Sequence, residues 1–319
     1  MTHIRVIWHG EKRQLTKLSE IGKTPLIEIR CTGHAPIFAK AEFLNPTGSH
    51  KDRAYLQMII DLEQSGELKA GMTLVDYTTG NGGASLAFVG REKGYSVVAV
   101  MPDNMTIERK QQIGNYGARL VLTPACDYVR GARATAEKIV RETDKSVLVN
   151  QSDNPGNRTA FYSIPQEIIA ALSFVTPPIS IRAFVGAIGT GGSITGIAEI
   201  YRKAEVHIPI IGFESLHSAS SLAAKLSLPF SASLHTLVGT SPGKVAVNTD
   251  LELIDHIEAV DERNISEARR ELEALDLNLG YTSHAAYNVA KKIARIMGEG
   301  INSVATMFYD AGWKYESER

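Results

Sequence analysis

Apolar and polar positions along the chain form a repeated series of short hydrophobic runs and longer amphipathic stretches. A strand is predicted over 36–43, and a helix over 52–64, where apolar residues recur at helical spacing. The same patterns predict further strands over 74–77, 96–101, 120–123, 181–188, 209–214, 257–260 and 303–308, and helices over 84–93, 107–116 and 129–143. Because strands that alternate with helices build parallel sheets covered by helices, the chain is predicted to be an α/β protein.

A polar, turn-rich segment over 151–158 divides this series into two layered α/β units. The predicted domains are residues 1–155 and 156–319, and 319 residues suffice for two domains around a cleft. A site in that cleft would draw residues from both halves of the chain.

Lys51 stands at the junction between a turn over 45–49 and the predicted helix 52–64. In the first turn of a helix, the positive end of the helix dipole and burial both favour the neutral form of a lysine amine. A neutral amine can attack an aldehyde, so Lys51 is the candidate for a Schiff base with a cofactor. An isolated lysine is far more often a solvated surface group, and the other motifs decide between these interpretations.

Two glycine-rich turns each follow a predicted strand and precede a helix. The turn 189–193 places backbone N–H groups and two hydroxyls where they can surround a phosphate, and Ser193 could cap the following helix. The turn 78–85 nearly fits the G-x-G-x-x-G pattern of dinucleotide-binding proteins, with Asp103 in the place of a ribose-binding acid. Its threonines and Asn81 favour a carboxylate and a phenolic oxygen as ligands instead. A dinucleotide-dependent oxidoreductase stays open as an alternative on these residues.

Composition narrows the function classes. The 34 Lys and Arg against 35 Asp and Glu leave a net charge of −1, which favours neither nucleic acid nor a membrane as a partner. The apolar region 168–188 is broken by prolines and Arg182, and the first 15 residues lack the apolar core of a secretory signal. Cys31 and Cys126 have no metal-ligand spacing, which predicts reduced core thiols and no metal. A cytoplasmic enzyme acting on small molecules is expected.

Four motifs together resemble a known family. They are N-P-T-G-S-H-K-D-R (45–53), T-T-G-N-G-G (78–83), M-P-D-N-M-T-I-E-R-K (101–110) and G-T-G-G-S (189–193). Their order and spacing are similar to those of fold-type II pyridoxal-phosphate enzymes, in particular the cysteine synthase and cystathionine β-synthase branch. The resemblance runs from residue 21 nearly to the C-terminus. It implies two layered α/β domains of the tryptophan synthase β-like kind, with pyridoxal 5'-phosphate in the cleft and a homodimer as the assembly.

The resemblance also implies roles for individual residues. Lys51 corresponds to the cofactor lysine, and Thr282 falls where the family places a hydroxyl beside the pyridine nitrogen. The other cofactor-binding residues it implies are Asn81 at the ring hydroxyl and Gly189, Thr190, Gly191, Gly192 and Ser193 at the phosphate. The substrate carboxylate would be bound by Thr78, Thr79, Gly80, Asn81, Gly82 and Gln151. The smaller, mobile domain would carry Lys51 and the carboxylate loop, with the N-terminal segment packing partly on the larger domain.

The activity that this resemblance implies is β-replacement on a serine-type amino acid such as O-acetylserine, O-phosphoserine or serine, through an α-aminoacrylate. A hydroxyl beside the pyridine nitrogen favours elimination over transamination, because a carboxylate there would keep the nitrogen protonated. Cysteine synthesis is the first expectation, and a 2,3-diaminopropionate or cystathionine synthase is an alternative. A serine or threonine dehydratase is another, although dehydratases of this family usually carry a histidine directly after the loop asparagine.

Four positions depart from the usual family pattern or suggest substrate specificity. Gly82 replaces a common threonine, His284 replaces a common glycine, and His50 precedes the lysine at a commonly apolar position. Lys244 lies in the segment 239–244, which is expected at the mouth of the site. Its ammonium group could contact an anionic leaving group or an acidic nucleophile; the competing interpretation is a solvated surface lysine.

Overall fold

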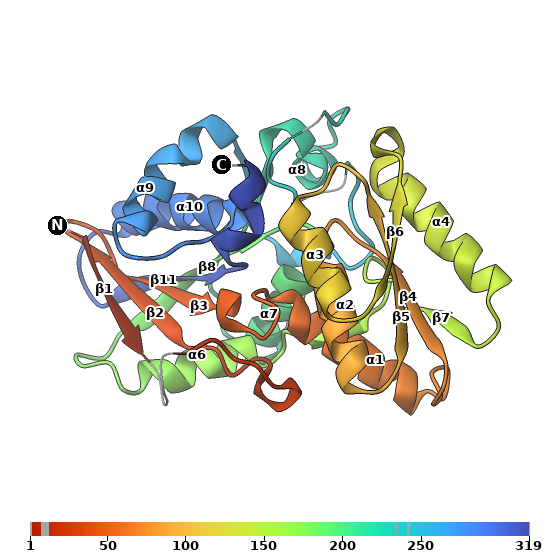
Figure 1. The fold of residues 1–319 in the computed structure, drawn as a ribbon. Helices are drawn as coiled ribbons and strands as arrows, with labels where there is room; N and C mark the ends of the chain where they lie inside the picture. Colours follow the sequence, from red (N-terminus) through yellow and green to blue (C-terminus); the bar gives the residue numbers. More distant parts are fainter. Residues whose placement is uncertain (1, 8–12, 234, 241–242, 319) are drawn as a thin grey trace.

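The computed structural model describes residues 2–7, 13–233, 235–240 and 243–318 and places two β-sheets side by side (Figure 1). The larger sheet has seven strands in the order β1-β2-β3-β11-β8-β9-β10, and the smaller has four in the order β6-β5-β4-β7. Both sheets are covered by helices, as the alternating sequence pattern predicts. The predicted α/β fold class with two layered units is therefore confirmed.

The larger sheet combines strands from the two ends of the chain. Its strands are β1 (Thr2–Ile7), β2 (Leu26–Cys31), β3 (Ile37–Ala41), β8 (Ser180–Ala187), β9 (Ile210–Ser215), β10 (His256–Val260) and β11 (Asn302–Phe308). β1, β2 and β3 pair antiparallel in sequence, whereas β3, β11, β8, β9 and β10 run parallel. In Figure 1, α9 (Ser266–Glu273) and α10 (Tyr281–Met297) lie above this sheet and α6 (Ile164–Leu172) lies below it.

The smaller sheet is entirely parallel and comes from one continuous part of the chain. Its strands are β4 (Thr73–Tyr77), β5 (Ser96–Pro102), β6 (Arg119–Thr123) and β7 (Ser146–Leu148). The helices α1 (Lys51–Gln64), α2 (Asn81–Glu92) and α3 (Ile107–Asn115) lie on one side, and α4 (Tyr128–Glu142) lies on the other (Figure 1). Three further helices are α5 (Gly156–Thr159), α7 (Gly192–Lys203) and α8 (Ser220–Lys225).

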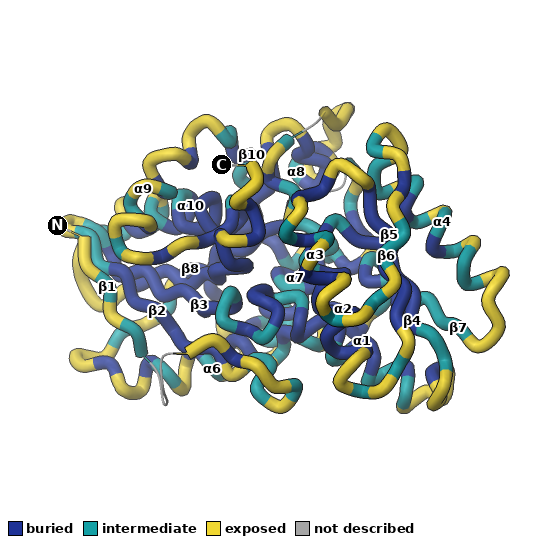
Figure 2. Tube along the Cα trace, viewed as in Figure 1, coloured by how far each residue is buried: buried dark blue, intermediate teal, exposed yellow. Residues whose placement is uncertain are grey.

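The hydrophobic core follows the apolar runs of the sequence. Phe38, Phe184 and Phe308 lie on the three central strands of the larger sheet and have no exposed surface. The central strands are buried in both sheets, while α4 keeps a long exposed face (Figure 2). Among the described residues, no helix is long and apolar enough to cross a membrane.

Two sequence expectations need correction. Cys126 is exposed and Cys31 is half-buried, so neither is a fully buried core thiol. The antiparallel pairing of β1 with β2 was not predicted. A pattern of alternating strands and helices predicts parallel pairing, and it does not indicate that an edge strand pairs antiparallel. The division into residues 1–155 and 156–319 stays a prediction; β1, β2 and β3 belong to the larger sheet.

Candidate active site

A cavity of about 390 Å³ contains most of the residues singled out in the sequence. Loops that follow the carboxyl ends of parallel strands form much of its wall, which is where α/β proteins usually bind ligands. The predicted residues that line it are Lys51, Thr78, Thr79, Asn81, Gly82, Gln151, Gly189, Thr190 and Lys244. They come from both halves of the chain, as a site in a cleft requires.

Lys51 is the first residue of α1, as predicted. Just before it, Ser49 forms an antiparallel bridge with Asp310, and the His50 amide donates to the Tyr309 carbonyl at 2.9 Å. These contacts hold the start of α1 against the end of β11 in the larger sheet. The Lys51 ammonium is thereby placed 3.2 Å from Thr190 Oγ1, to which it donates a hydrogen bond.

Burial lowers the pKa of Lys51 to about 8, and the nearby Asp76 carboxylate opposes this shift. His50, the residue before Lys51, is uncharged. Burial, and then the charge of Lys51, hold the pKa of His50 well below its ordinary value. Its ring packs edge-on against Tyr309 at 5.0 Å and beside Phe161 at 5.9 Å. His50 therefore acts as a neutral aromatic neighbour at a position where an apolar residue is usual.

The lowered pKa of Lys51 predicts how the rate of Schiff-base formation between the apoprotein and pyridoxal phosphate changes with pH. Because the neutral amine reacts, a pKa of about 8 should give an about tenfold increase in the rate constant from pH 7 to pH 9, followed by a plateau. Stopped-flow absorbance measures this rate. An increase of about a hundredfold over the same interval, still continuing at pH 10, would indicate an ordinary lysine instead.

The turn between β8 and α7 is closely packed. A side chain at Gly189 would lie 2.3 Å from the Gly239 carbonyl oxygen, and one at Gly191 would lie 2.2 Å from Thr249 Oγ1. Gly191 also has φ +82°, which favours glycine. Thr190 Oγ1 accepts a second hydrogen bond, from Asn157 Nδ2 at 3.0 Å. The backbone N–H groups at the start of α7 lack partners within the helix and suit an anion.

The capping role expected for Ser193 is wrong. α7 begins at Gly192, its N-cap is Gly191, and no side chain caps it. Ser193 therefore lies inside the first turn. Its hydroxyl and its amide are still within the segment proposed to bind the phosphate.

The turn between β4 and α2 is stabilised by the hydroxyl group of one of its own residues, Thr78. Thr78 Oγ1 accepts hydrogen bonds from the amides of Gly80 and Gly83, each at 2.9 Å. Gln151 Nε2 donates to the Tyr77 carbonyl at 3.0 Å, which brings Gln151 beside this loop. A side chain at Gly82 would lie 3.0 Å from Gln151 Nε2 and 2.9 Å from the Tyr55 hydroxyl. Gln151 and Tyr55 therefore leave little room for a side chain at this position, which fits the presence of glycine where a threonine is usual.

Asp310 is a site residue that the sequence reasoning missed. Asn81 Nδ2 donates to Asp310 Oδ2 at 2.7 Å, and the Tyr315 hydroxyl donates to the same oxygen at 2.6 Å. Asn81 is thus held by a carboxylate 229 positions away in the sequence. Its own Oδ1 is buried without a partner. The signal available in the sequence was a single aspartate shortly after the last predicted strand.

Thr282 lies in the first turn of α10 and is buried, and it does not line the cavity directly. A side chain at Gly239, which does line the cavity, would lie 2.6 Å from Thr282 Oγ1. The threonine hydroxyl therefore lies directly beside Gly239, which belongs to the cavity wall. His284 lies two residues further along the same helix, is also buried, and packs edge-on against Tyr281 at 6.3 Å.

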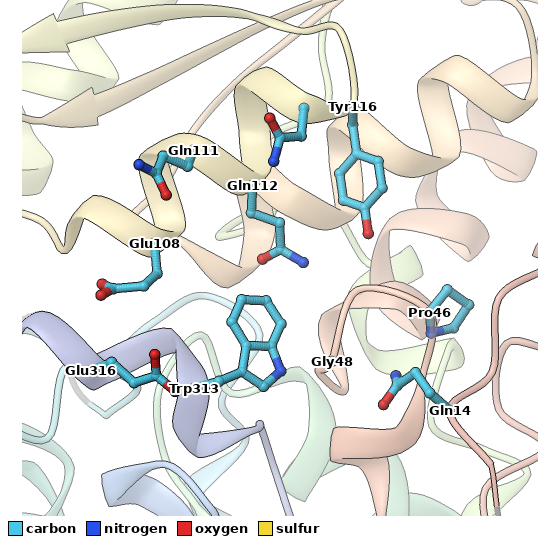
Figure 3. A pocket seen from close by; sticks show the side chains of 10 residues that line it. Gln14, Pro46, Gly48, Glu108, Gln111, Gln112, Tyr116, Trp313 and Glu316 are labelled. Atoms are coloured by element: carbon cyan, nitrogen blue, oxygen red, sulfur yellow. The ribbon is translucent and has the colours of Figure 1, made fainter.

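A second cavity, of about 420 Å³, contains none of the predicted site residues. Figure 3 shows Trp313 between α3, with Glu108 and Gln112, and the turn that carries Pro46. Lys314, the next residue in the sequence, is fully buried and donates to Gln112 Oε1 at 2.6 Å. These contacts join α3 to the C-terminal segment.

Comparison with known proteins agrees with this geometry. Residues 17–309 match the family of pyridoxal-phosphate dependent enzymes. Cysteine synthase B of Campylobacter jejuni is 34% identical over 94% of this chain and 97% of that protein. The structure of O-ureido-L-serine synthase superposes with a TM-score of 0.84 at 30% identity, covering 94% of this chain and 92% of the other. O-acetylserine sulfhydrylase isoform 3 of Entamoeba histolytica gives 0.84 at 28% identity, covering 97% and 92%.

The chain belongs to the pyridoxal-phosphate dependent enzymes, and pyridoxal phosphate is its cofactor. The site has the features that this cofactor needs: a lysine of lowered pKa, a glycine turn at a helix start, and buried polar atoms without partners. The latter include Asn81 Oδ1 and Thr249 Oγ1. Family membership excludes the dinucleotide-dependent oxidoreductase that the Gly80 turn had left open.

Proposed function

We propose that this enzyme catalyses β-replacement on a serine-type amino acid, most closely in the manner of a cysteine synthase. The observation that carries the proposal is the position of the Lys51 amine, which reaches Thr190 of the phosphate turn inside the cavity that the Thr78–Gly82 loop also lines. The similarity to cysteine synthases and to an O-ureido-L-serine synthase supports the same reaction class.

Each part of the site has a role in this proposal. The turn Gly189–Ser193 and the start of α7 hold the phosphate, and Asn81, fixed by Asp310, faces the ring hydroxyl. The loop Thr78–Gly82 and Gln151 bind the substrate carboxylate through hydroxyl, amide and backbone donors. Pyridoxal phosphate supplies the electron sink for breaking the Cα–H bond. Lys51 holds the cofactor and, once released, accepts the α-proton at Nζ.

Thr282 is proposed as the partner of the pyridine nitrogen. Its substitution by aspartate should protonate that nitrogen, because a carboxylate pairs with the charged form. We expect the Thr282→Asp enzyme to lose β-elimination at least about tenfold and to gain transamination of the same donor. Leaving-group release and amino-group transfer to a keto acid are measured side by side, with Thr282→Ser as the matched control. Unchanged rates and an unchanged spectrum would place Thr282 away from the ring.

Replacement and dehydration are separated by one product analysis. The enzyme is incubated with O-acetylserine, O-phosphoserine or serine, each with and without sulfide. Cysteine formed at the expense of pyruvate supports replacement. Pyruvate formed at the same rate with and without sulfide would support a dehydratase instead. A diaminopropionate or cystathionine synthase would prefer an amine or a thiol amino acid to sulfide.

The proposal includes a cytoplasmic homodimer, as expected from the sequence. Light scattering coupled to size-exclusion chromatography measures the assembly. A mass near twice 34.7 kDa is expected.

A further inference from the structure

The active-site cavity has an unbalanced set of charges. Among the described residues that line it, the basic side chains are those of Lys51, Arg109, Arg130, Arg133 and Lys244, and none carries a carboxylate. Such a concentration of one sign in a cleft attracts ligands of the opposite sign.

The basic residues differ in how far their charges are balanced. Arg133 donates to Glu137 and to Asp153, each at 2.9 Å, so two carboxylates next to the cavity offset its charge. Within the described part of the chain, neither Arg109 nor Arg130 has a carboxylate at ion-pair distance. Arg109 is 3% exposed, and its Nε is buried without a partner. The Asp310 and Glu318 carboxylates act on Arg109 only from beyond ion-pair distance, so its guanidinium can still accept an anion as a direct partner.

Arg109 lies along the substrate loop. Its Nη1 donates to the Thr79 carbonyl at 3.4 Å, and its guanidinium stacks 4.3 Å from the centre of the Tyr315 ring. Arg130, near the start of α4, and Lys244 are both exposed, so they lie at the solvent end of the cavity. We call Arg130 and Lys244 the cationic rim. The cavity is thus positive from the substrate loop to its opening.

The cofactor phosphate and the α-carboxylate do not account for this charge. In the proposed function both are bound by backbone N–H groups, hydroxyls and amides, from the turn 189–193, the loop 78–82 and Gln151. We propose that the cationic rim, together with Arg109, binds a second anionic group carried by one of the two reactants. This inference rests on the proposed β-replacement. The group is either a phosphate leaving group on the donor or a side-chain carboxylate on the nucleophile.

The first test measures binding without turnover. Inorganic phosphate and succinate are titrated into the holoenzyme by calorimetry, for the wild type, for Arg130→Gln/Lys244→Gln, and for Lys138→Gln/Arg141→Gln. The last variant removes two exposed charges from the far part of α4 and changes net charge equally. We expect the rim variant to bind one of the anions roughly ten- to a hundredfold more weakly than the wild type and the control. Equal binding by all three proteins, or none by the wild type, would overturn the proposal.

The second test identifies the source of the anion by steady-state kinetics. O-phosphoserine is compared with O-acetylserine, with sulfide as nucleophile, and L-aspartate is then compared with L-asparagine as nucleophile on the better donor. In the rim variant, kcat/KM for the charged member of one pair should fall at least tenfold more than for its neutral counterpart. Equal losses within both pairs would overturn the proposal. A wild-type holoenzyme that consumes no donor would refute the proposed β-replacement. Calorimetry would then still show whether the cationic rim binds an anion, because it measures binding without turnover.

Discussion

Substitution of Lys51 by alanine is expected to reduce donor turnover by at least about a thousandfold, because one side chain holds the cofactor and moves the α-proton. The protein should remain folded, since the buried amine makes one hydrogen bond, to Thr190, and its lowered pKa shows that the site disfavours the charge. The visible absorbance of a lysine-bound cofactor should disappear with the activity. Leaving-group release and an absorbance spectrum of the dialysed protein measure both effects.

Lys138→Ala is the matched control for this experiment. Lys138 is on α4, its side chain is 64% exposed, and its pairing with Glu142 at 3.8 Å is a surface contact worth little. Its substitution should leave turnover and spectrum unchanged. A Lys51→Ala enzyme that keeps more than about a tenth of wild-type turnover would remove Lys51 from the mechanism.

Substitution of Gly191 by alanine is expected to weaken cofactor binding roughly ten- to a hundredfold or more. Gly191 has φ +82°, and a Cβ atom there would lie 2.5 Å from the Thr249 backbone nitrogen as well as 2.2 Å from its hydroxyl. The turn would have to move away from Thr249 and would displace the start of α7, whose N–H groups are proposed to bind the phosphate. Fluorescence titration of the apoprotein with pyridoxal phosphate measures the dissociation constant.

Gly114→Ala serves as the control for the glycine substitution. Gly114 lies in α3, is exposed, and has open space where a Cβ would be placed. Alanine is favoured over glycine in a helix by about 0.5–1 kcal/mol, so this variant should be slightly more stable and bind the cofactor normally. Equal cofactor affinity in the two variants would show that the turn 189–193 does not contact the phosphate.

The sequence was sufficient for the parts of the site that are encoded locally. A strand, a glycine-rich turn and a helix follow one another at 74–93 and again at 181–203. Residues of both turns line one cavity, with Gly189 and Thr190 contributed by the second turn. Lys51 could be located because the turn before it and the helix after it are both visible in the residue pattern. Such turns can be predicted from the sequence because their residues permit few other backbone conformations.

The parts that could not be predicted depend on residues far apart in the chain. Asp310 reaches Asn81 through the pairing of β11 with β3 in the larger sheet and the bridge to Ser49. Arg130 borders the cavity because α4 begins beside it, and no sequence motif marks that position. Lys244 was singled out in the sequence and does line the cavity. The sequence could not show which other charged side chains line the cavity with it, because these come from distant parts of the chain.

The most direct test of the central claim is to reduce the holoenzyme with borohydride and map the modified peptides by mass spectrometry. Reduction fixes the pyridoxyl group on the lysine that carries it, whatever substrate the enzyme uses. We predict a single labelled peptide, with the mass increment on Lys51, and loss of activity in proportion to the label. A pyridoxyl group on any other lysine, with Lys51 unmodified, would contradict the assignment of Lys51 and the mechanism built on it.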